Sequence, residues 1–198
     1  MPAIVLWIAV IIIAISAAGL IFSRDWRWSL LMLAGQYFGA FLLVLVHWPL
    51  TMSAAKLVAG WMSVAILGMT RINVKDSSQP RADNPWPQGR VFRFFAISLV
   101  FVSVIFASRG IEFWLPDAGA PVIIGAAILI GMGLLHLGVT ARPLYVTLGL
   151  LTVLCGFEIL YSSIENSILV AGFLAAINLG LALTGVYLLT LDNEEETA

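Results

Sequence analysis

The chain has 198 residues, of which 61% are hydrophobic and 11% are charged, and its formal net charge is −1. Soluble domains carry about 25% charged residues, and the mean hydropathy of this chain is +1.03, so the composition excludes an ordinary soluble protein and indicates an integral membrane protein. No basic patch recurs with interleaved aromatic residues, which excludes nucleic acid as a predicted partner and leaves the lipid bilayer.

Seven apolar runs follow one another along the chain, and an α-helix needs about 20 such residues to cross a bilayer. The runs cover residues 4–22, 28–46, 52–70, 94–108, 120–139, 143–161 and 167–191. The first has no basic residue before it and is longer than the apolar core of a signal peptide, so we interpret it as a retained anchor. We therefore predict an all-α integral membrane protein with about seven transmembrane helices and no soluble domain, and residues 1–198 as a single polytopic membrane domain. Because 94–108 is short and 143–161 almost joins 167–191, six or eight spans remain open.

The basic residues predict the orientation. Eight of the ten follow the first, third and fifth runs: Arg24, Arg27, Arg71, Lys75, Arg81, Arg90, Arg93 and Arg142. Since Lys and Arg gather on the cytoplasmic side, we expect a multi-pass protein of the cell (inner) membrane with its N-terminus outside and its C-terminus in the cytoplasm. Residues 71–93, with three prolines and five basic residues, are predicted to form an extended cytoplasmic loop.

Two charged residues lie inside the predicted spans. Lys56 is about five residues into the third run, and Glu158 lies in the outer part of the sixth. A charged side chain that faces lipid costs several kcal/mol, so such residues usually face other helices and pair. Lys56 is the only basic residue at a depth similar to that of Glu158, and we therefore expect the two side chains to lie close together and Glu158 to face protein.

Four more polar residues are candidates for an ion pathway. If the sixth helix continues far enough, Glu165 lies on the same face as Glu158, with the carboxylates about 10 Å apart along the axis. Gln36 and Asn178 lie near mid-depth, and His136 lies near the cytoplasmic end of the fifth run. These residues are predicted to form a series of polar groups across the membrane, the polar ladder. The alternatives are that Gln36 and Asn178 form interhelical hydrogen bonds, that His136 lies in a helix interface, and that Glu165 lies in an external turn.

The last run has small residues at four-residue spacing: Gly172, Ala176, Gly180 and Thr184. Such a stripe lets another helix approach closely, so we expect this face to pack against protein.

Cofactors and catalytic sites are not expected. His47 and His136 lie at opposite depths, which disfavours a haem with two histidine ligands, and clustered metal ligands, phosphate loops and nucleophile–base pairs are absent from the sequence. We predict no cofactor, no metal and no intrinsic enzymatic activity.

The segments "GFEIL" (Gly156–Leu160) and "ILVAG" (Ile168–Gly172) resemble the glutamate-bearing helix region of a family of small membrane subunits. It comprises the three-helix K subunit of respiratory complex I, the C subunit of Mrp-type antiporters and the seven-helix E subunit of formate-hydrogenlyase-type membrane hydrogenases. The similarity extends over 123–191 at most. "TARPLY" (Thr140–Tyr145) matches the turn before the helix, whereas Asn178 stands in the last span, which lacks the second buried glutamate of the complex I subunit.

The resemblance implies an accessory subunit beside a larger antiporter-like membrane protein, with Glu158 as the buried acid of a lateral proton or cation path. Two other functions remain open from the residues: a self-sufficient oligomeric transporter or channel, and a purely structural membrane assembly subunit.

Overall fold

The computed structural model describes residues 3–23, 25–73 and 89–197, and Arg24, Lys75, Arg81 and the middle of the predicted loop lie outside these ranges. The described residues form seven α-helices and one short 3-10 helix: α1 (Ala3–Phe22), α2 (Trp26–Val44), α3 (Leu50–Asn73), α4 (Arg90–Trp114), η1 (Pro116–Ala118), α5 (Ala120–Val139), α6 (Pro143–Ser162) and α7 (Ile168–Thr197). All seven α-helices are long and apolar enough to cross a membrane. The prediction of an all-α membrane protein with seven spans is confirmed.

Three helices, α3, α4 and α7, extend several residues beyond the spans predicted for them. The predicted fourth span, 94–108, is part of a helix of 25 residues, and α7 continues past Leu191 to Thr197. Charged residues at the ends of these helices, such as Arg93 and Glu112, are compatible with helix but interrupt the apolar run from which the spans were predicted. Because α3 ends at Asn73 and α4 begins at Arg90, both ends of the predicted loop 71–93 are helical.

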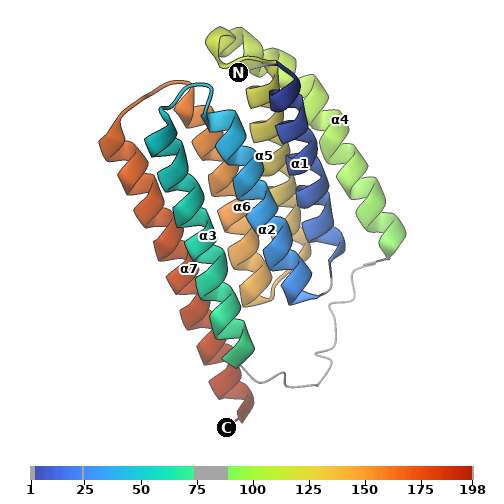
Figure 1. The fold of residues 1–198 in the computed structure, drawn as a ribbon. Coiled ribbons are helices and arrows are strands. Elements are labelled where there is room, and N and C mark those ends of the chain that lie inside the picture. The colour runs from blue at the N-terminus through green and yellow to red at the C-terminus, as the bar shows by residue number, and fades with distance from the viewer. Residues whose placement is uncertain (1–2, 24, 74–88, 198) are drawn as a thin grey trace.

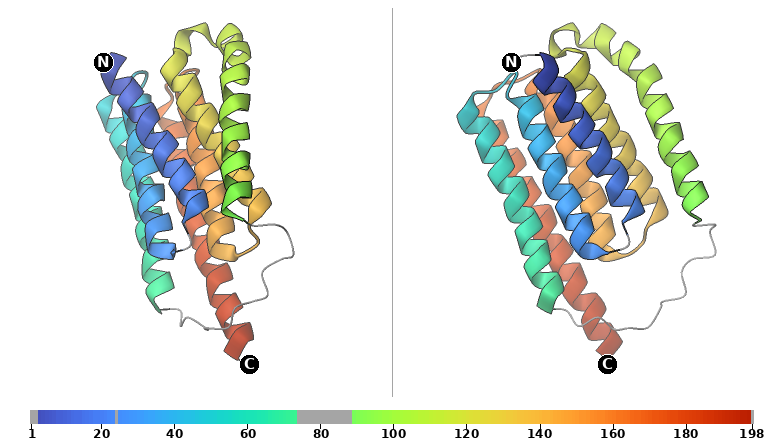
Figure 2. Two further views of the ribbon diagram at one scale, coloured as in Figure 1. Left: turned by 90° about the vertical axis from the view of Figure 1, so that its right-hand side faces the viewer. Right: turned by 45° about the vertical axis from the view of Figure 1, so that its right-hand side comes forward.

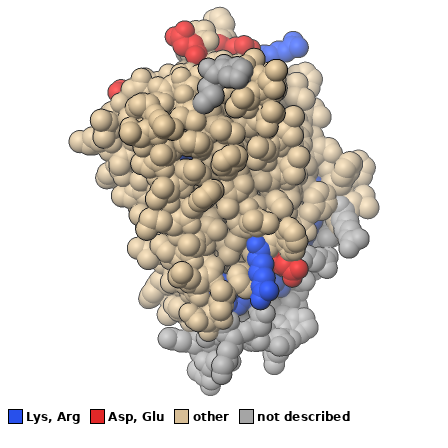
Figure 3. Space-filling view, in the orientation of Figure 1, with Lys and Arg blue, Asp and Glu red and all other residues tan. Residues whose placement is uncertain are grey.

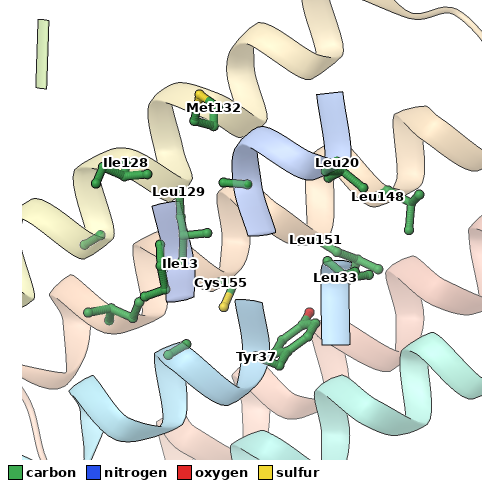
Figure 4. Packing of buried hydrophobic residues seen from close by; sticks show 14 of the residues in the cluster. Ile13, Leu20, Leu33, Tyr37, Ile128, Leu129, Met132, Leu148, Leu151 and Cys155 are labelled. Atoms are coloured by element: carbon green, nitrogen blue, oxygen red, sulfur yellow. The ribbon is translucent and has the colours of Figure 1, made fainter. Parts of the chain in front are cut away.

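The helices run alternately up and down along the bundle (Figure 1). We call the end at which α1 begins the upper end and the end at which α7 finishes the lower end, as they are drawn in Figure 1. Helices α1, α2, α5 and α6 pack around a shared apolar core, α3 and α7 pack on each other beside α2 and α6, and α4 packs mainly on α5 (Figure 2). Figure 4 shows the core between these helices, with Ile13, Leu33, Leu129 and Leu151 directed into it.

The outer surface of the bundle is apolar. Large side chains such as Ile15 on α1, Phe106 on α4 and Phe173 on α7 are more than 60% exposed. Figure 3 shows the charged side chains gathered near the two ends and a largely uncharged face between them. A surface of this kind suits contact with the hydrocarbon of a lipid bilayer, and the chain is a multi-pass membrane protein.

Candidate functional site in the membrane

The central feature of the site is an ion pair between α3 and α6. The Lys56 ammonium donates a hydrogen bond to Oε2 of Glu158, and the Lys56 and Glu158 side chains are only 5% and 2% exposed, respectively. Lys56 lies about 9 Å and Glu158 about 6 Å below the upper ends of their helices, at 1.5 Å per residue. The prediction that Glu158 faces protein beside Lys56 is therefore confirmed.

A third helix, α7, contacts this ion pair through Asn178. Its Nδ2 atom donates to Oε1 of Glu158 at 2.6 Å and to the backbone carbonyl of Leu174 at 3.3 Å. Both carboxylate oxygens of Glu158 therefore accept a hydrogen bond from nitrogen, one from Lys56 and one from Asn178. These donors stabilise the ionised carboxylate in a part of the protein that water does not reach.

Tyr37 of α2 completes the group. Its hydroxyl donates to Oδ1 of Asn178 at 2.6 Å, and the residue is fully buried. The donors thus point in one direction, from Tyr37 through Asn178 to Glu158. We call Tyr37, Lys56, Glu158 and Asn178 the buried polar cluster; it joins α2, α3, α6 and α7.

Close packing between α2 and α3 holds the Tyr37 ring. A Cβ atom added to Gly60 would lie 2.2 Å from Cδ1 of Tyr37, so only glycine leaves room for the ring. One turn further along α3, the Ser63 hydroxyl contacts the backbone carbonyls of Ala59 at 3.0 Å and of Asn178 at 3.3 Å. These contacts fix α2, α3 and α7 around the buried polar cluster.

A second polar contact lies between α2 and α6. The Thr152 hydroxyl contacts Oε1 of Gln36 at 2.9 Å and the carbonyl of Leu148 at 2.8 Å, and Gln36 is fully buried. Nε2 of Gln36 has no hydrogen-bond partner. Gln36 thus forms a separate interhelical contact. It precedes Tyr37 in the sequence but makes no hydrogen bond to the buried polar cluster.

His136 lies apart from these groups. It is buried near the lower end of α5, its Nε2 atom has no hydrogen-bond partner, and its ring centroid lies 6.0 Å from that of Tyr145. About 24 Å of helix separates its position from the upper end of α5 at 1.5 Å per residue, whereas Glu158 is close to the upper end of α6. The structure therefore brings Glu158 and Asn178 of the predicted ladder together and leaves His136 at the other end.

Glu165 does not share a helical face with Glu158. Helix α6 ends at Ser162, and Glu165 lies exposed in the turn before α7, where its backbone carbonyl accepts a hydrogen bond from Nε1 of Trp48 at 2.8 Å. The polar, turn-forming sequence "SSIENS" (Ser162–Ser167) ends the helix. The continuous carboxylate stripe that a longer α6 would have produced is not formed.

The small-residue stripe of α7 faces away from the bundle, so no described helix of this chain packs against it, and its packing against another protein stays a prediction. Gly172, Ala176, Gly180 and Thr184 are exposed, and a Cβ atom added to either glycine meets nothing within 4 Å. Another face of the helix, which contains Leu174, Asn178 and Ala182, is buried, and α7 packs against α3 and α6. Asn178 lies on this inward face, where it hydrogen bonds to Tyr37 and Glu158.

Tyr37, Ser63 and Thr152 were missed by the sequence analysis. Tyrosine, serine and threonine are common in membrane helices and carry no formal charge, so none of them stands out in an apolar run. The pairing of Lys56 with Glu158 was predictable because charges are rare at this depth. Among the residues that the structure describes, no three His, Cys, Asp or Glu side chains come together as a metal site would require.

Comparisons of this chain with protein-family models, with curated proteins and with solved structures find no significant match.

Proposed function

We propose that this chain is an accessory membrane subunit of a proton-translocating complex, in which Lys56 and Glu158 carry the proton. The observation that supports this most strongly is the ion pair between α3 and α6, buried inside a bundle of membrane-spanning helices. The proposal includes the cell (inner) membrane as the location, the N-terminus outside and the C-terminus in the cytoplasm, because eight of the ten basic residues fall on one predicted side.

Protein stability alone does not explain why two charged residues lie in this buried site. Removing two charges from water costs several kcal/mol per ion, and replacing a buried pair by apolar residues of similar volume is often neutral or stabilising by about 1–4 kcal/mol. Ionisable residues inside membrane spans usually mark ion or proton pathways. The presence of Lys56 and Glu158 in a site that is only 2–6% exposed therefore favours a function in charge movement.

The hydrogen bonds favour a proton over a metal cation as the ion that moves. Hard cations bind several oxygen ligands at once, but each carboxylate oxygen of Glu158 already faces a nitrogen donor, and Oδ1 of Asn178 accepts from Tyr37. The Lys56 ammonium occupies the place beside the carboxylate that a cation would take. A proton needs only the two atoms of the ion pair, Nζ and Oε2.

The transfer within the pair conserves charge. A proton that leaves Nζ of Lys56 and bonds to Oε2 of Glu158 converts an ammonium and a carboxylate into a neutral amine and a carboxylic acid. The acid then releases its proton to a titratable group of a partner subunit, and the amine takes up another proton from a group of the same class. Net movement of one proton restores the original pair.

The position of the cluster suits an accessory subunit. Helices α3 and α7 form a layer beside α2 and α6 (Figure 1), so the cluster lies one helix away from the lipid-facing side. A proton that moves laterally from the cluster to a neighbouring membrane subunit would need to pass only the layer formed by α3 and α7. The resemblance of Gly156–Gly172 to the small subunits of complex I, Mrp antiporters and membrane hydrogenases supports the same function.

The test is proton flux in membrane vesicles that contain the native complex, followed with a pH-sensitive dye. Glu158→Gln is expected to leave the complex assembled and to abolish flux, while Lys56→Met/Glu158→Gln keeps the complex intact without an unpaired charge and is equally inactive. Glu165→Gln is the matched control, because it makes the same chemical change in the exposed turn and is expected to retain flux.

Normal flux in Glu158→Gln would refute the proposal and favour a structural assembly subunit. Purification separates the remaining alternative: co-elution with larger membrane subunits supports an accessory subunit, whereas a homogeneous homo-oligomer that moves protons in liposomes identifies a self-sufficient transporter.

A further inference from the structure

We propose that Tyr37 is a positioning residue that fixes the amide of Asn178 in one orientation, so that Glu158 faces an N–H donor and not a carbonyl oxygen. This inference rests on the proposed function, since it assigns a control on the proton-carrying group of that site. Tyr37 does not contact Glu158 through a hydrogen bond of its own; it acts through Asn178.

The contacts of the Asn178 amide distinguish its two ends. Oδ1 faces a hydroxyl donor, Tyr37, at 2.6 Å, and Nδ2 faces two acceptors, the Glu158 carboxylate at 2.6 Å and the Leu174 carbonyl at 3.3 Å. Rotating the amide by half a turn would place its oxygen against both of these acceptors and leave the phenol hydrogen without its acceptor. With Tyr37 present and Glu158 ionised, only the observed orientation satisfies all three groups.

Protonation of Glu158 changes what the amide can offer. A carboxylic acid has one hydrogen to donate, and a rotated Asn178 would present Oδ1 to accept it. Tyr37 opposes this rotation because its buried hydroxyl would lose its acceptor, and an unsatisfied buried donor is costly. The hydroxyl of Tyr37 therefore favours the ionised form of Glu158, the form that pairs with Lys56.

The packing around Tyr37 makes this restraint rigid. The residue is fully buried, and Gly60 of α3 allows the ring to lie against the backbone of that helix. Tyr37→Phe keeps this ring contact and removes only the hydroxyl. The substitution therefore isolates the hydrogen bond to Asn178 from the packing of α2 against α3.

The other titratable groups near Glu158 are few. Lys56 faces it from α3, Tyr37 comes from α2, and Cys155 lies three residues before it on α6. Helix α7 contributes Asn178, which is neutral, and α5 carries a single titratable residue, His136, near its lower end. The Lys56 charge is common to the wild type and Tyr37→Phe, so a difference between them reports on the hydroxyl.

The experiment is an infrared pH titration of the purified protein in lipid nanodiscs. The C=O stretch of the Glu158 carboxylic acid is assigned by its absence in Glu158→Gln. We expect Tyr37→Phe to move the midpoint of this band to higher pH by about one unit, a tenfold change in the protonation equilibrium. Tyr187→Phe, which removes an exposed hydroxyl from α7, is the matched control and is expected to leave the curve unchanged. Superimposable curves for wild type and Tyr37→Phe, including curves that show no acid band in either, would overturn the proposal.

A double-mutant cycle tests whether Tyr37 acts through Asn178. In an Asn178→Leu background, Tyr37→Phe is expected to add no further shift, because the amide that it orients is gone. The same shift in both backgrounds would mean that the hydroxyl acts on Glu158 directly and would refute the mechanism. If Tyr37→Phe does not fold, Asn178→Leu tests the mechanism, because it removes the N–H donor that Tyr37 orients toward Glu158. It is expected to move the curve in the same direction, and an unmoved curve would refute the mechanism.

The infrared and flux results separate this inference from the proposed function. A shifted band in Tyr37→Phe together with no proton flux in the wild-type complex would leave the positioning role intact and refute translocation. Loss of flux in Glu158→Gln with an unshifted band in Tyr37→Phe would support translocation and refute the positioning role.

Discussion

Removing one partner of the buried ion pair should destabilise the protein far more than removing both charges. In Glu158→Gln, the new amide has one oxygen and one NH2 group, whereas the native carboxylate accepts from both Lys56 and Asn178. Whichever way the amide turns, an N–H donor faces another donor. Lys56 is only 6% exposed, so water does not replace the lost acceptor.

The expected loss of unfolding free energy follows from this geometry. Breaking a buried pair by removing one partner costs about 3–5 kcal/mol. For a chain of this size each kcal/mol lowers the melting temperature by about 2–4 °C, which gives a decrease of roughly 6–20 °C for Glu158→Gln. The double variant Lys56→Met/Glu158→Gln has no buried charge, and its amide oxygen still accepts from Asn178. We expect it to lie within about 1 kcal/mol of the wild type or above it.

Thermal unfolding in detergent, followed by the fraction that remains monodisperse on gel filtration, measures these differences. Glu165→Gln is the control, because its side chain is exposed in the turn between α6 and α7, and surface changes of this kind stay within about 0.5 kcal/mol. A Glu158→Gln protein as stable as the wild type, or a double variant as unstable as Glu158→Gln, would show that an unpaired Lys56 charge does not destabilise the protein.

Two further predictions concern helix packing and topology. Gly60→Ala places a methyl group 2.2 Å from Cδ1 of Tyr37 and should lower the free energy of unfolding by about 1–3 kcal/mol in the same assay. Gly172→Ala adds a Cβ that meets nothing within 4 Å and should be neutral or slightly stabilising. Equal effects of the two substitutions would contradict the tight α2–α3 contact. Ala141 and Asn166 lie in exposed connections at opposite ends of the bundle. A membrane-impermeant maleimide added outside intact cells should therefore label the Asn166→Cys variant and not the Ala141→Cys variant. Labelling of Ala141→Cys instead would show that the orientation is opposite to the proposed one.

The sequence by itself determines the class of fold and the main charged pair. Seven long apolar runs have to become helices, because only a helix satisfies the backbone hydrogen bonds of a single segment inside lipid. Lys56 and Glu158 were predictable as partners for a similar reason: a lone charge at this depth is costly, and the chain offers one basic residue near one buried acid. Both conclusions follow from the bilayer as a solvent and need no knowledge of how the helices pack.

The tertiary structure decides which face of each helix turns inward. Helix α7 is apolar on nearly every side, so its sequence has no polar period to distinguish the face of Gly172 from the face of Asn178. The inward face is chosen by specific contacts with α3 and α6, and the small-residue stripe is left outside. Likewise, Tyr37 enters the site only because Gly60, on another helix, leaves room for its ring. Such contacts join residues far apart in the chain, and their geometry depends on the packing of side chains that no single helix specifies.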